Sequence, residues 1–494
     1  MGALILSIDQ GTTSTRAILF DPAGNILGVS QKELKLYYPD NGWVEQDPRD
    51  IWADTQQVCR DVLKSRGIKP SQVAAIGITN QRETTIVWDR KTGEPVHNAI
   101  VWQDRRTANF CEKLEKDGYL EKVRARTGLL IDPYFSGTKI KWILDNVSGV
   151  KEKAKKGELA FGTMDCFLLW KMTGGKVHAT DATNASRTMI FNIVKQEWDD
   201  DLLALLDIPR ALLPQVKDCS GDFGKVTPDF IGCDVPVTGI AGDQQAALFG
   251  QACFSPGMVK STYGTGCFAL INIGDSFRES KNRMLTTVAY RLNGKTTYAI
   301  EGAIFSAGAA IQWLRDGLGI IGSAAQTEEI ARSVPDTGGV YLVPAFTGLG
   351  APYWNPHARG SLTGLTRGSS RAHIVRAALE AQAYQTEDLM RAMIEDAGDR
   401  IDEIRVDGGM VKNSWVCQFL ADITNTPVLR PAITETTALG AAYLAGLHAG
   451  IFSSLEDIRK AWKCENYFSP AMPDTERRTL YAGWQQAVRQ VLAN

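Results

Sequence analysis

The stretch DQGTTSTR at residues 9–16 lies between two short apolar runs, residues 3–8 and 16–20, and a third β-leaning run follows at residues 26–30. Glycine and threonine in such a break are typical of a tight turn between strands. A second turn, YGTG at residues 263–266, also separates two runs of this kind. The repeated strand–turn–strand pattern predicts two domains of similar plan, with a boundary near residue 252.

Both turns are suited to hold phosphate oxygens, because large side chains do not obstruct their backbone N–H groups. Taken alone, each turn is also an ordinary hairpin connection. Residues 264–266 fit the dinucleotide-binding fingerprint loosely, but that fingerprint must open a helix, and residues 267–273 read as a strand. The sequence contains no Gly-x-x-x-x-Gly-Lys-Ser/Thr stretch, which excludes a P-loop NTPase and favours a kinase with phosphate-binding hairpins.

Strand-like and helix-like segments interleave along the whole chain, which predicts an α/β fold. One helix is expected to begin after Asp47, with Pro48 in its first turn, and to stop at Gly67. Another is expected at residues 436–448, where the sequence is rich in alanine. Gly440 in that helix favours close packing against a neighbouring element.

Asp243 stands where an apolar run at residues 235–241 meets a predicted helix at residues 244–250. The carboxylate is therefore expected at the carboxyl end of a strand, where open α/β sheets bind their ligands. Aspartate is also a common helix N-cap, so a purely structural role stays open. The functional alternative is a general base that takes a proton from a substrate hydroxyl.

Arg82 and Glu83 follow a predicted strand at residues 73–79. Such neighbours often form a surface ion pair of little consequence. In a binding site, arginine donates and glutamate accepts hydrogen bonds, which suits adjacent hydroxyls of a polyol. The polar clusters at residues 80–83 and 103–106 are expected to converge on one cleft.

Further candidates could contact a nucleotide or the carbon side of a polyol. Residues 407–409, Asp-Gly-Gly, are either a simple turn or a close backbone approach to a nucleotide base. Gly308 and Gln312 could flank the same adenosine, although a buried helix that packs through small residues explains them nearly as well. Three aromatic residues are either core residues or the wall of the polyol site: Trp102, Tyr134 and Phe268.

The composition limits the partners of the chain. Its 494 residues carry 54 Lys and Arg against 56 Asp and Glu, a formal charge of −2, which gives no general attraction for nucleic acid or anionic membrane. Nine cysteines without a Cys-x-x-Cys pair indicate reduced thiols. No apolar stretch approaches the roughly 20 residues that a membrane span needs. We expect a cytoplasmic enzyme that acts on small molecules, and the expected assembly is a homodimer or a homotetramer.

Two long patterns carry a family resemblance. Residues 134–146 read YFSGTKIKWILDN, and residues 360–365, GSLTGL, lead to HIVRAALE at residues 373–380. With these two patterns the chain resembles the FGGY family of carbohydrate kinases over nearly its whole length. The resemblance implies two ribonuclease-H-like domains of the actin and hexokinase type, residues 1–252 and 253–494, with an active-site cleft between them.

Four shorter motifs resemble those of family members that act on glycerol: TNQRETT at residues 79–85, DPYFS at 132–136, GDQQ at 242–245 and TYGTG at 262–266. This narrower resemblance implies transfer of the γ-phosphoryl group of ATP to glycerol, with Asp243 as the catalytic base. The residues expected to contact glycerol are Arg82, Glu83, Trp102, Tyr134, Asp243, Gln244 and Phe268. The residues expected to contact the nucleotide are Thr12, Thr13, Ser14, Arg16, Thr265, Gly308, Gln312, Gly409 and Asn413. Asp9 and Asp243 are expected to hold Mg²⁺, partly through water.

Two rival functions stay open at this point. A kinase of the same family could act on a pentulose, erythritol or gluconate, because the phosphate turns serve any of these acceptors. A non-catalytic actin-like ATPase could instead polymerise or clamp a partner, but that function leaves Arg82, Glu83 and Asp243 without a purpose. An assay of ATP consumption against the acceptors separates the first rival, and sedimentation with and without ATP tests the second.

Overall fold

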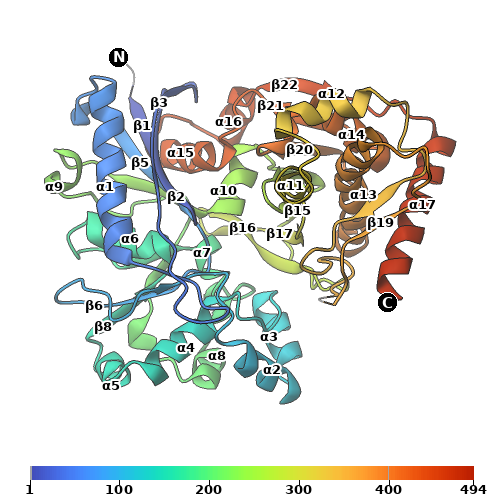
Figure 1. Cartoon of the computed structure of the whole chain (residues 1–494). Helices are drawn as coiled ribbons and strands as arrows, with labels where there is room; N and C mark the ends of the chain where they lie inside the picture. Colours follow the sequence, from blue (N-terminus) through green and yellow to red (C-terminus); the bar gives the residue numbers. More distant parts are fainter. Residues whose placement is uncertain (1–2, 356, 399, 494) are drawn as a thin grey trace.

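The computed structural model describes residues 3–355, 357–398 and 400–493 and contains two large β-sheets that lie side by side (Figure 1). The first sheet is formed by β1 (Leu4–Gln10), β2 (Ser14–Phe20), β3 (Ile26–Glu33), β5 (Val73–Asn80) and β13 (Val237–Gly242). The second is formed by β14 (Met258–Tyr263), β15 (Cys267–Gly274), β16 (Leu285–Leu292), β17 (Lys295–Ile304), β20 (Glu403–Asp407), β21 (Val428–Pro431) and β22 (Cys464–Phe468).

The two sheets share one plan. In the first sheet β3, β2 and β1 are antiparallel neighbours, and β5 and β13 follow in parallel. In the second sheet β17, β15 and β14 are antiparallel neighbours, and β20 and β21 follow in parallel. The prediction of two similar halves, each opened by a hairpin, is therefore confirmed. The exact boundary at residue 252 stays a prediction, because a late helix of the chain packs on the first sheet.

That late helix is α15 (Thr436–His448), which covers one face of the first sheet while α1 (Pro48–Ser65) covers the other (Figure 1). Successive side chains of a strand point to opposite faces. Leu6 and Ile8 of β1 accordingly pack in the apolar cluster of α1, whereas Ile5 packs in the cluster of α15. Both faces of the strands that lead to the site are thus buried.

The helix α15 also packs closely against α10 (Asp243–Gly250), the helix that follows β13. Gly440 permits this contact, because a Cβ atom there would lie 1.8 Å from the carbonyl oxygen of Ala246. The predicted close packing at Gly440 is therefore confirmed. As a result α10, which begins with Asp243, is held between the two halves.

The helix α1 begins and ends as predicted. The Asp47 side chain accepts a hydrogen bond from the backbone N of Arg49 at 2.8 Å, and Pro48 occupies the first helical position. The helix stops at Ser65, two residues before Gly67. This agreement follows from the preference of aspartate for the N-cap and of proline for the first turn.

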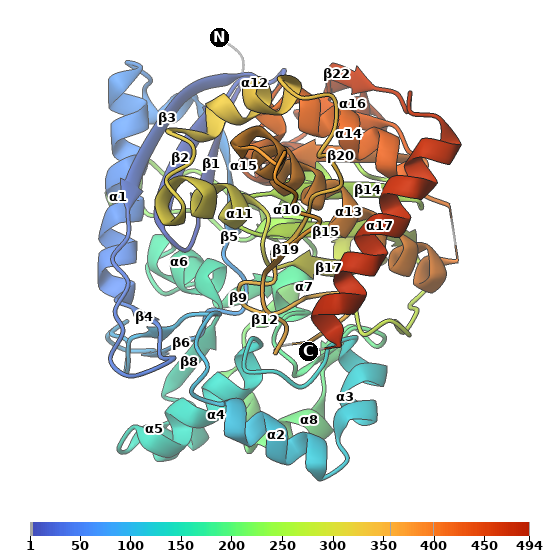
Figure 2. The ribbon, with the colours of Figure 1, turned by 45° about the vertical axis from the view of Figure 1, so that its right-hand side comes forward.

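Short helices form a separate group below the first sheet (Figure 2), namely α2 (Ala108–Lys116), α3 (Leu120–Thr127), α4 (Ser136–Asn146), α5 (Val150–Lys155) and α8 (Asp200–Leu206). On the other side, α13 (Arg371–Ala397) packs against the second sheet, and α14 (Ser414–Thr424) and α17 (Asp474–Leu492) pack against α13. None of the described helices combines the length and the apolar character that crossing a bilayer requires.

Shorter elements complete the described chain. Five strand pairs lie outside the large sheets: β4 (Glu45–Gln46) with β7 (Ala99–Ile100), β6 (Ile86–Asp89) with β8 (Leu159–Gly162), β9 (Ala179–Asp181) with β12 (Gln215–Lys217), β10 (Phe191–Asn192) with β11 (Glu197–Trp198), and β18 (Tyr341–Val343) with β19 (Ser361–Thr363). The remaining α-helices are α6 (Met164–Met172), α7 (Ala182–Ala185), α9 (Pro228–Ile231), α11 (Gly308–Gln312), α12 (Thr327–Arg332) and α16 (Leu455–Ala461).

Candidate active site

Asp243 is the first residue of α10 and follows the buried strand β13 directly. The carboxylate therefore stands at the carboxyl end of a strand, as predicted. Its Oδ1 accepts a hydrogen bond from the backbone N of Gln244 at 2.7 Å and lies 3.0 Å from Arg82 Nε. Gly242, not Asp243, occupies the N-cap position. Asp243 is therefore not the N-cap itself, although its side chain bonds to the first turn of the helix, and about a third of the side chain, 32%, stays exposed.

A cavity of about 50 Å³ lies in front of Asp243. A single water molecule needs about 10–15 Å³ by this kind of measure, so the cavity suits a ligand of a few heavy atoms. The structure brings together in this one space all seven residues expected to contact the polyol, and one residue of the first phosphate turn. The lining residues are Thr12, Arg82, Glu83, Trp102, Tyr134, Asp243, Gln244 and Phe268.

Aromatic rings form the apolar wall of this cavity, which we call the polyol cavity. The rings of Trp102 and Tyr134 meet edge to face, with centroids 5.6 Å apart. Trp102 Nε1 donates a hydrogen bond to Thr12 Oγ1 at 2.8 Å. This bond connects the aromatic wall to the turn at residues 11–13, so the polyol cavity and the first phosphate turn are fixed relative to each other.

Arg82 and Glu83 lie at the floor of the polyol cavity and are only 3% and 1% exposed. The alternative of a surface ion pair is therefore wrong. Glu83 has a backbone φ of 59°, in the left-handed region that residues other than glycine rarely adopt. Such strained residues concentrate at ligand sites, where the surrounding structure holds them in place.

Two charged residues that the sequence analysis missed lie behind Arg82 and Glu83, outside the cavity lining. Glu301 accepts hydrogen bonds from Arg82 Nη1 at 2.5 Å and from Arg82 Nη2 at 3.0 Å. Arg187 Nε donates to Glu83 Oε1 at 2.6 Å. A sequence signal existed for Glu301 alone, as an isolated carboxylate in the apolar run at residues 298–304. Arg187 lies after the four-residue helix α7 and has no comparable signal.

The two glycine–threonine turns close hairpins, as predicted. In the first, the backbone N of Gly11 donates to Ser14 O at 2.9 Å, and in the second the N of Gly264 donates to Gly266 O at 2.9 Å. The segment after the second turn is the strand β15 and not a helix, which confirms that the dinucleotide fingerprint does not apply.

A larger cavity of about 520 Å³ lies beside the second turn. Gly308 allows α11 to approach this turn, because a Cβ atom there would lie 2.5 Å from Gly264 O. We call this space the nucleotide cavity. Its lining is Tyr263, Gly264, Thr265, Gly308, Ile311, Gln312, Arg315, Ala324, Ala325, Thr327, Glu328, Leu379, Gly409, Met410, Lys412 and Asn413.

The nucleotide cavity contains five of the nine residues expected to contact nucleotide, namely Thr265, Gly308, Gln312, Gly409 and Asn413. The other four come from the first hairpin and lie outside it. Of these, Thr12 lines the polyol cavity, and Thr13, Ser14 and Arg16 line neither cavity. Three charged residues of the nucleotide cavity were not predicted: Arg315, Glu328 and Lys412.

Arg16 does not stand free beside the first turn. It forms ion pairs with Asp9 and, at 2.6 Å, with Glu435, the residue before α15. Burial raises the pKa of Asp9, although Arg16 opposes the shift and Asp243 and Glu435 add to it. Acidic side chains thus gather at this end of the cleft, yet no group of three or more metal-binding side chains occurs within the part of the chain that the structure describes.

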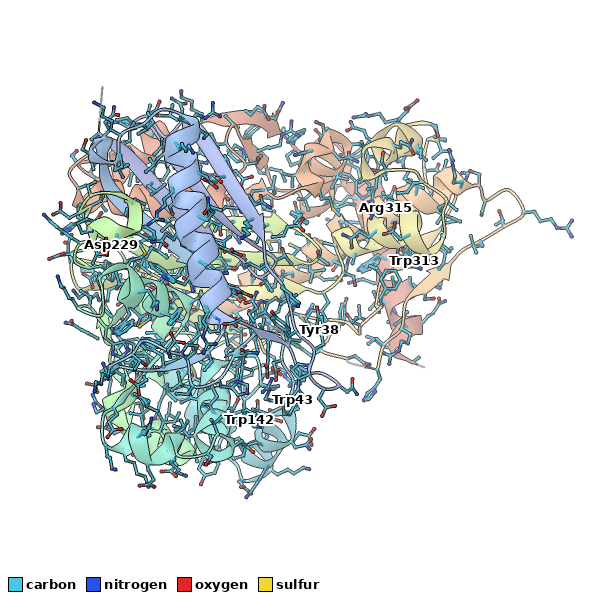
Figure 3. The ribbon with its side chains drawn as sticks, turned by 60° about the vertical axis from the view of Figure 1, so that its left-hand side comes forward. Tyr38, Trp43, Trp142, Asp229, Trp313 and Arg315 are labelled. Carbon is cyan, nitrogen blue, oxygen red and sulfur yellow. The ribbon has the colours of Figure 1, made fainter. Side chains whose placement is uncertain are left out.

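The polar cluster at residues 103–106 does not reach the polyol cavity, so the expectation that it converges there is wrong. The Arg106 guanidinium contacts the rings of both Trp43 and Trp142, 3.9 and 4.5 Å from their centroids, and pairs with Glu45 at 2.7 Å. Figure 3 shows Trp43 and Trp142 next to each other. Cation–π contacts and a buried ion pair hold this side chain away from the cleft.

Family models cover most of the chain. The N-terminal domain of the FGGY family of carbohydrate kinases matches residues 4–250, and its C-terminal domain matches residues 259–449. The chain belongs to the FGGY family of carbohydrate kinases. The predicted family and the two-domain FGGY fold, of the actin and hexokinase type, are therefore confirmed.

FGGY relatives match over nearly the full length. A glycerol kinase of Nitrosomonas eutropha is 62% identical over 489 residues, which are 99% of this chain and 98% of the relative. A glycerol kinase of Alcanivorax borkumensis is 60% identical over 487 residues, again 99% and 98%. The crystal structure of Plasmodium falciparum glycerol kinase with ADP is 36% identical and superposes with a TM-score of 0.94 over 99% of this chain and 98% of that one.

Proposed function

We propose that this FGGY kinase transfers the γ-phosphoryl group of ATP to a terminal hydroxyl of glycerol, giving sn-glycerol 3-phosphate and ADP. The observation that carries the proposal is the polyol cavity, in which one carboxylate, Asp243, shares a small space with Arg82, Glu83 and three aromatic rings. The family membership and the names of the full-length relatives support the same reaction.

Asp243 is the proposed general base. Its Oδ1 is bonded to the backbone N of Gln244 and lies beside Arg82 Nε, while no hydrogen bond or ion pair among the described residues ends at Oδ2. Oδ2 can therefore accept the proton of a glycerol hydroxyl while the oxygen of that hydroxyl attacks the γ-phosphorus of ATP. A positioned base of this kind contributes about 10² to 10⁴ in rate.

The remaining residues of the polyol cavity would hold glycerol in place. Arg82 and Glu83 would donate and accept hydrogen bonds at its hydroxyls, and Trp102 and Phe268 would pack on its carbons. In phosphoryl transfer the protein mainly positions the reactants and neutralises charge. Thr12 supports this geometry, because it lines the polyol cavity and belongs to the first phosphate turn.

ATP would lie with its adenosine in the nucleotide cavity and its phosphates between the two turns. That cavity, about 520 Å³, is an order of magnitude larger than the polyol cavity, which matches the difference in size between the two substrates. The solved relative that contains ADP supports nucleotide binding by the family. Thr13, Ser14 and Arg16 remain proposed phosphate contacts, and Arg16 would have to exchange its bond with Asp9 or Glu435 for a phosphate oxygen.

The residues at this end of the cleft fit Mg²⁺. The ion prefers oxygen ligands, keeps several waters and needs only one or two carboxylates besides the phosphates. Asp9 and Asp243 would hold it, and they are near enough that the charge of Asp243 adds to the rise in the pKa of Asp9. When bound, Mg²⁺ would neutralise charge on the transferred phosphoryl group. The cytoplasmic location and the homodimer or homotetramer stay predictions.

A coupled assay of ADP release tests the proposal, with glycerol, erythritol, xylulose or gluconate as the only acceptor. We expect ADP release to depend on glycerol and to produce glycerol 3-phosphate in equal amount. Greater efficiency with a pentulose or gluconate would contradict the proposed acceptor. ADP release that no acceptor stimulates would instead favour an actin-like ATPase, and sedimentation with and without ATP would then detect polymers.

A further inference from the structure

Three side chains form one row across the second sheet, on the face that turns toward α10. Lys260 of β14 pairs with Leu270 of β15, and Leu270 pairs with Glu301 of β17. Directly paired residues point to the same face of a sheet. Leu270 packs in one apolar cluster with Ala246 of α10. A lysine and a glutamate, 0% and 2% exposed, thus flank Leu270 and point toward the first half of the chain.

Glu301 holds Arg82 with both of its oxygens. Oε2 accepts from Arg82 Nη1 at 2.5 Å, and Oε1 accepts from Arg82 Nη2 and from Arg187 Nη2, each at 3.0 Å. Although burial opposes ionisation, the guanidinium groups of Arg187 and Arg82 lower the pKa of Glu301 to about 2. The carboxylate is therefore charged at neutral pH and fixes the plane of the Arg82 guanidinium.

Arg187 extends this contact to Glu83. Its Nε donates to Glu83 Oε1 at 2.6 Å, and its side chain is 0% exposed. Within the described chain no hydrogen bond ends at Glu83 Oε2. Arg187 therefore orients the Glu83 carboxylate through one oxygen and leaves the other for a ligand hydroxyl.

Lys260 contacts a different pair of residues that line the polyol cavity. Its Nζ donates to Gln244 Oε1 at 2.5 Å and to the carbonyl oxygen of Phe268 at 3.3 Å. Gln244 and Phe268 line the polyol cavity, whereas Lys260 does not. The second sheet thus contacts the cavity residues of the first half at two separate points.

We propose that Glu301 and Lys260 of the second sheet, together with Arg187, are positioning residues that set the affinity of the polyol cavity. None of them lines the cavity, yet each is bonded to a side chain that does. A buried ion pair is weak evidence for stability, because desolvation can cancel its attraction. Side chains that are already held in place before glycerol binds lose less conformational freedom on binding, which lowers the free-energy cost of binding. The inference rests on the proposed function, since it concerns the acceptor site of that reaction.

The first test is Glu301→Gln, which keeps the shape of the side chain and removes its charge. We expect the KM for glycerol to rise about tenfold or more, the effect of losing one charge-assisted hydrogen bond, while the KM for ATP stays within about twofold. Glu380→Gln is the matched control. Glu380 is also buried and pairs with an arginine, Arg376, at 2.9 Å, but it lies on α13, outside the polyol cavity. It should leave the KM for glycerol unchanged.

A second variant tests the inference if Glu301→Gln protein does not fold. The double variant Arg187→Met with Glu301→Met removes one positive and one negative charge together, and apolar replacement of a buried pair is often neutral for stability. Arg82 keeps Glu83 and Asp243 as charge partners, at 3.8 and 3.0 Å. We expect this variant to fold and to raise the KM for glycerol to a similar extent. The KM for ATP should again stay within about twofold. Lys260→Met should raise the KM for glycerol in the same way, by releasing Gln244.

The following results of these measurements would overturn the inference. An unchanged KM for glycerol in folded Glu301→Gln protein overturns it, and so do equal rises in the KM values for glycerol and ATP. Loss of folding in both Glu301→Gln and the double variant also overturns it, because the three residues would then serve stability. A wild-type protein that does not phosphorylate glycerol overturns the proposed function and this inference together, which separates that failure from the others.

Discussion

Asp243 and Arg82 contact each other at the carboxyl ends of two neighbouring parallel strands, β13 and β5, with Asp243 Oδ1 3.0 Å from Arg82 Nε. The guanidinium that belongs to the floor of the polyol cavity therefore also orients the proposed base. One arginine thus links acceptor binding to proton removal, and variants of the two residues should separate these roles.

Asp243→Asn should lower kcat by about 10² to 10⁴, because the amide keeps an oxygen for Arg82 but cannot take the proton. The KM for glycerol should change little. Steady-state kinetics with glycerol and ATP as varied substrates measure both values. Near-normal turnover would remove Asp243 from the role of base.

Arg82→Ala should mainly raise the KM for glycerol, by about 10²-fold, since at least one charged hydrogen bond to a hydroxyl is lost. It should also lower the free energy of unfolding by about 3–5 kcal/mol, because Glu301 loses a buried partner. Arg376→Ala, which breaks the ion pair to the buried Glu380, is the control for stability alone. An unchanged KM for glycerol in Arg82→Ala would mean that other residues bind the hydroxyls.

Gly308→Ala should raise the KM for ATP and leave the KM for glycerol nearly unchanged. The added Cβ would lie 2.5 Å from Gly264 O, so the second phosphate turn or α11 must shift. Gly221→Ala is the control, because the nearest atom to its Cβ would be 4.0 Å away. Equal effects of the two variants on ATP binding would contradict the assignment of the nucleotide cavity.

Asp165 should make the stability of the protein depend on pH. Burial, aided by Asp181, raises the pKa of Asp165 from 3.8 to about 7. Between these values the folded protein keeps a proton that the unfolded protein has lost, so this contribution to stability is full below 3.8 and is lost as the pH rises through about 7. In this range the free energy of unfolding should fall by at most about 1.4 kcal/mol per pH unit.

In the variant Asp165→Asn this side chain is uncharged at every pH. The variant should therefore lack this pH dependence of stability. We expect the difference in Tm between wild type and variant to change between pH 5 and pH 8, with wild type losing stability relative to the variant. Thr163 and Thr180, which donate to the Asp165 carboxylate at 2.5 and 2.6 Å, can also bond to an amide. The same Tm difference at both pH values would contradict the raised pKa.

Local signals predicted much of the fold, and the family resemblance predicted most of the site. The apolar run before Asp243 and the glycine–threonine turns are short-range patterns, and the structure places them at a strand end and in two hairpins. The residues of the polyol cavity were predicted through the family resemblance and gather in one space. The turns and the strand before Asp243 need no knowledge of distant contacts, whereas the residues of the polyol cavity come from distant segments and needed the resemblance.

The residues that escaped prediction depend on contacts far apart in the sequence. Glu301 is separated from Arg82 by 219 residues, and Arg187 from Glu83 by 104. No local pattern can pair such side chains. The wrong expectation for residues 103–106 has the same cause, because Arg106 is held by Trp43 and Trp142 from separate segments.

A crystal structure with glycerol and a non-hydrolysable ATP analogue tests the central claim most directly. We predict that glycerol lies in the polyol cavity, with one terminal hydroxyl within hydrogen-bond distance of Asp243 and in line with the γ-phosphorus. A structure in which Asp243 points away from that hydroxyl, or in which glycerol binds outside the polyol cavity, would contradict the account.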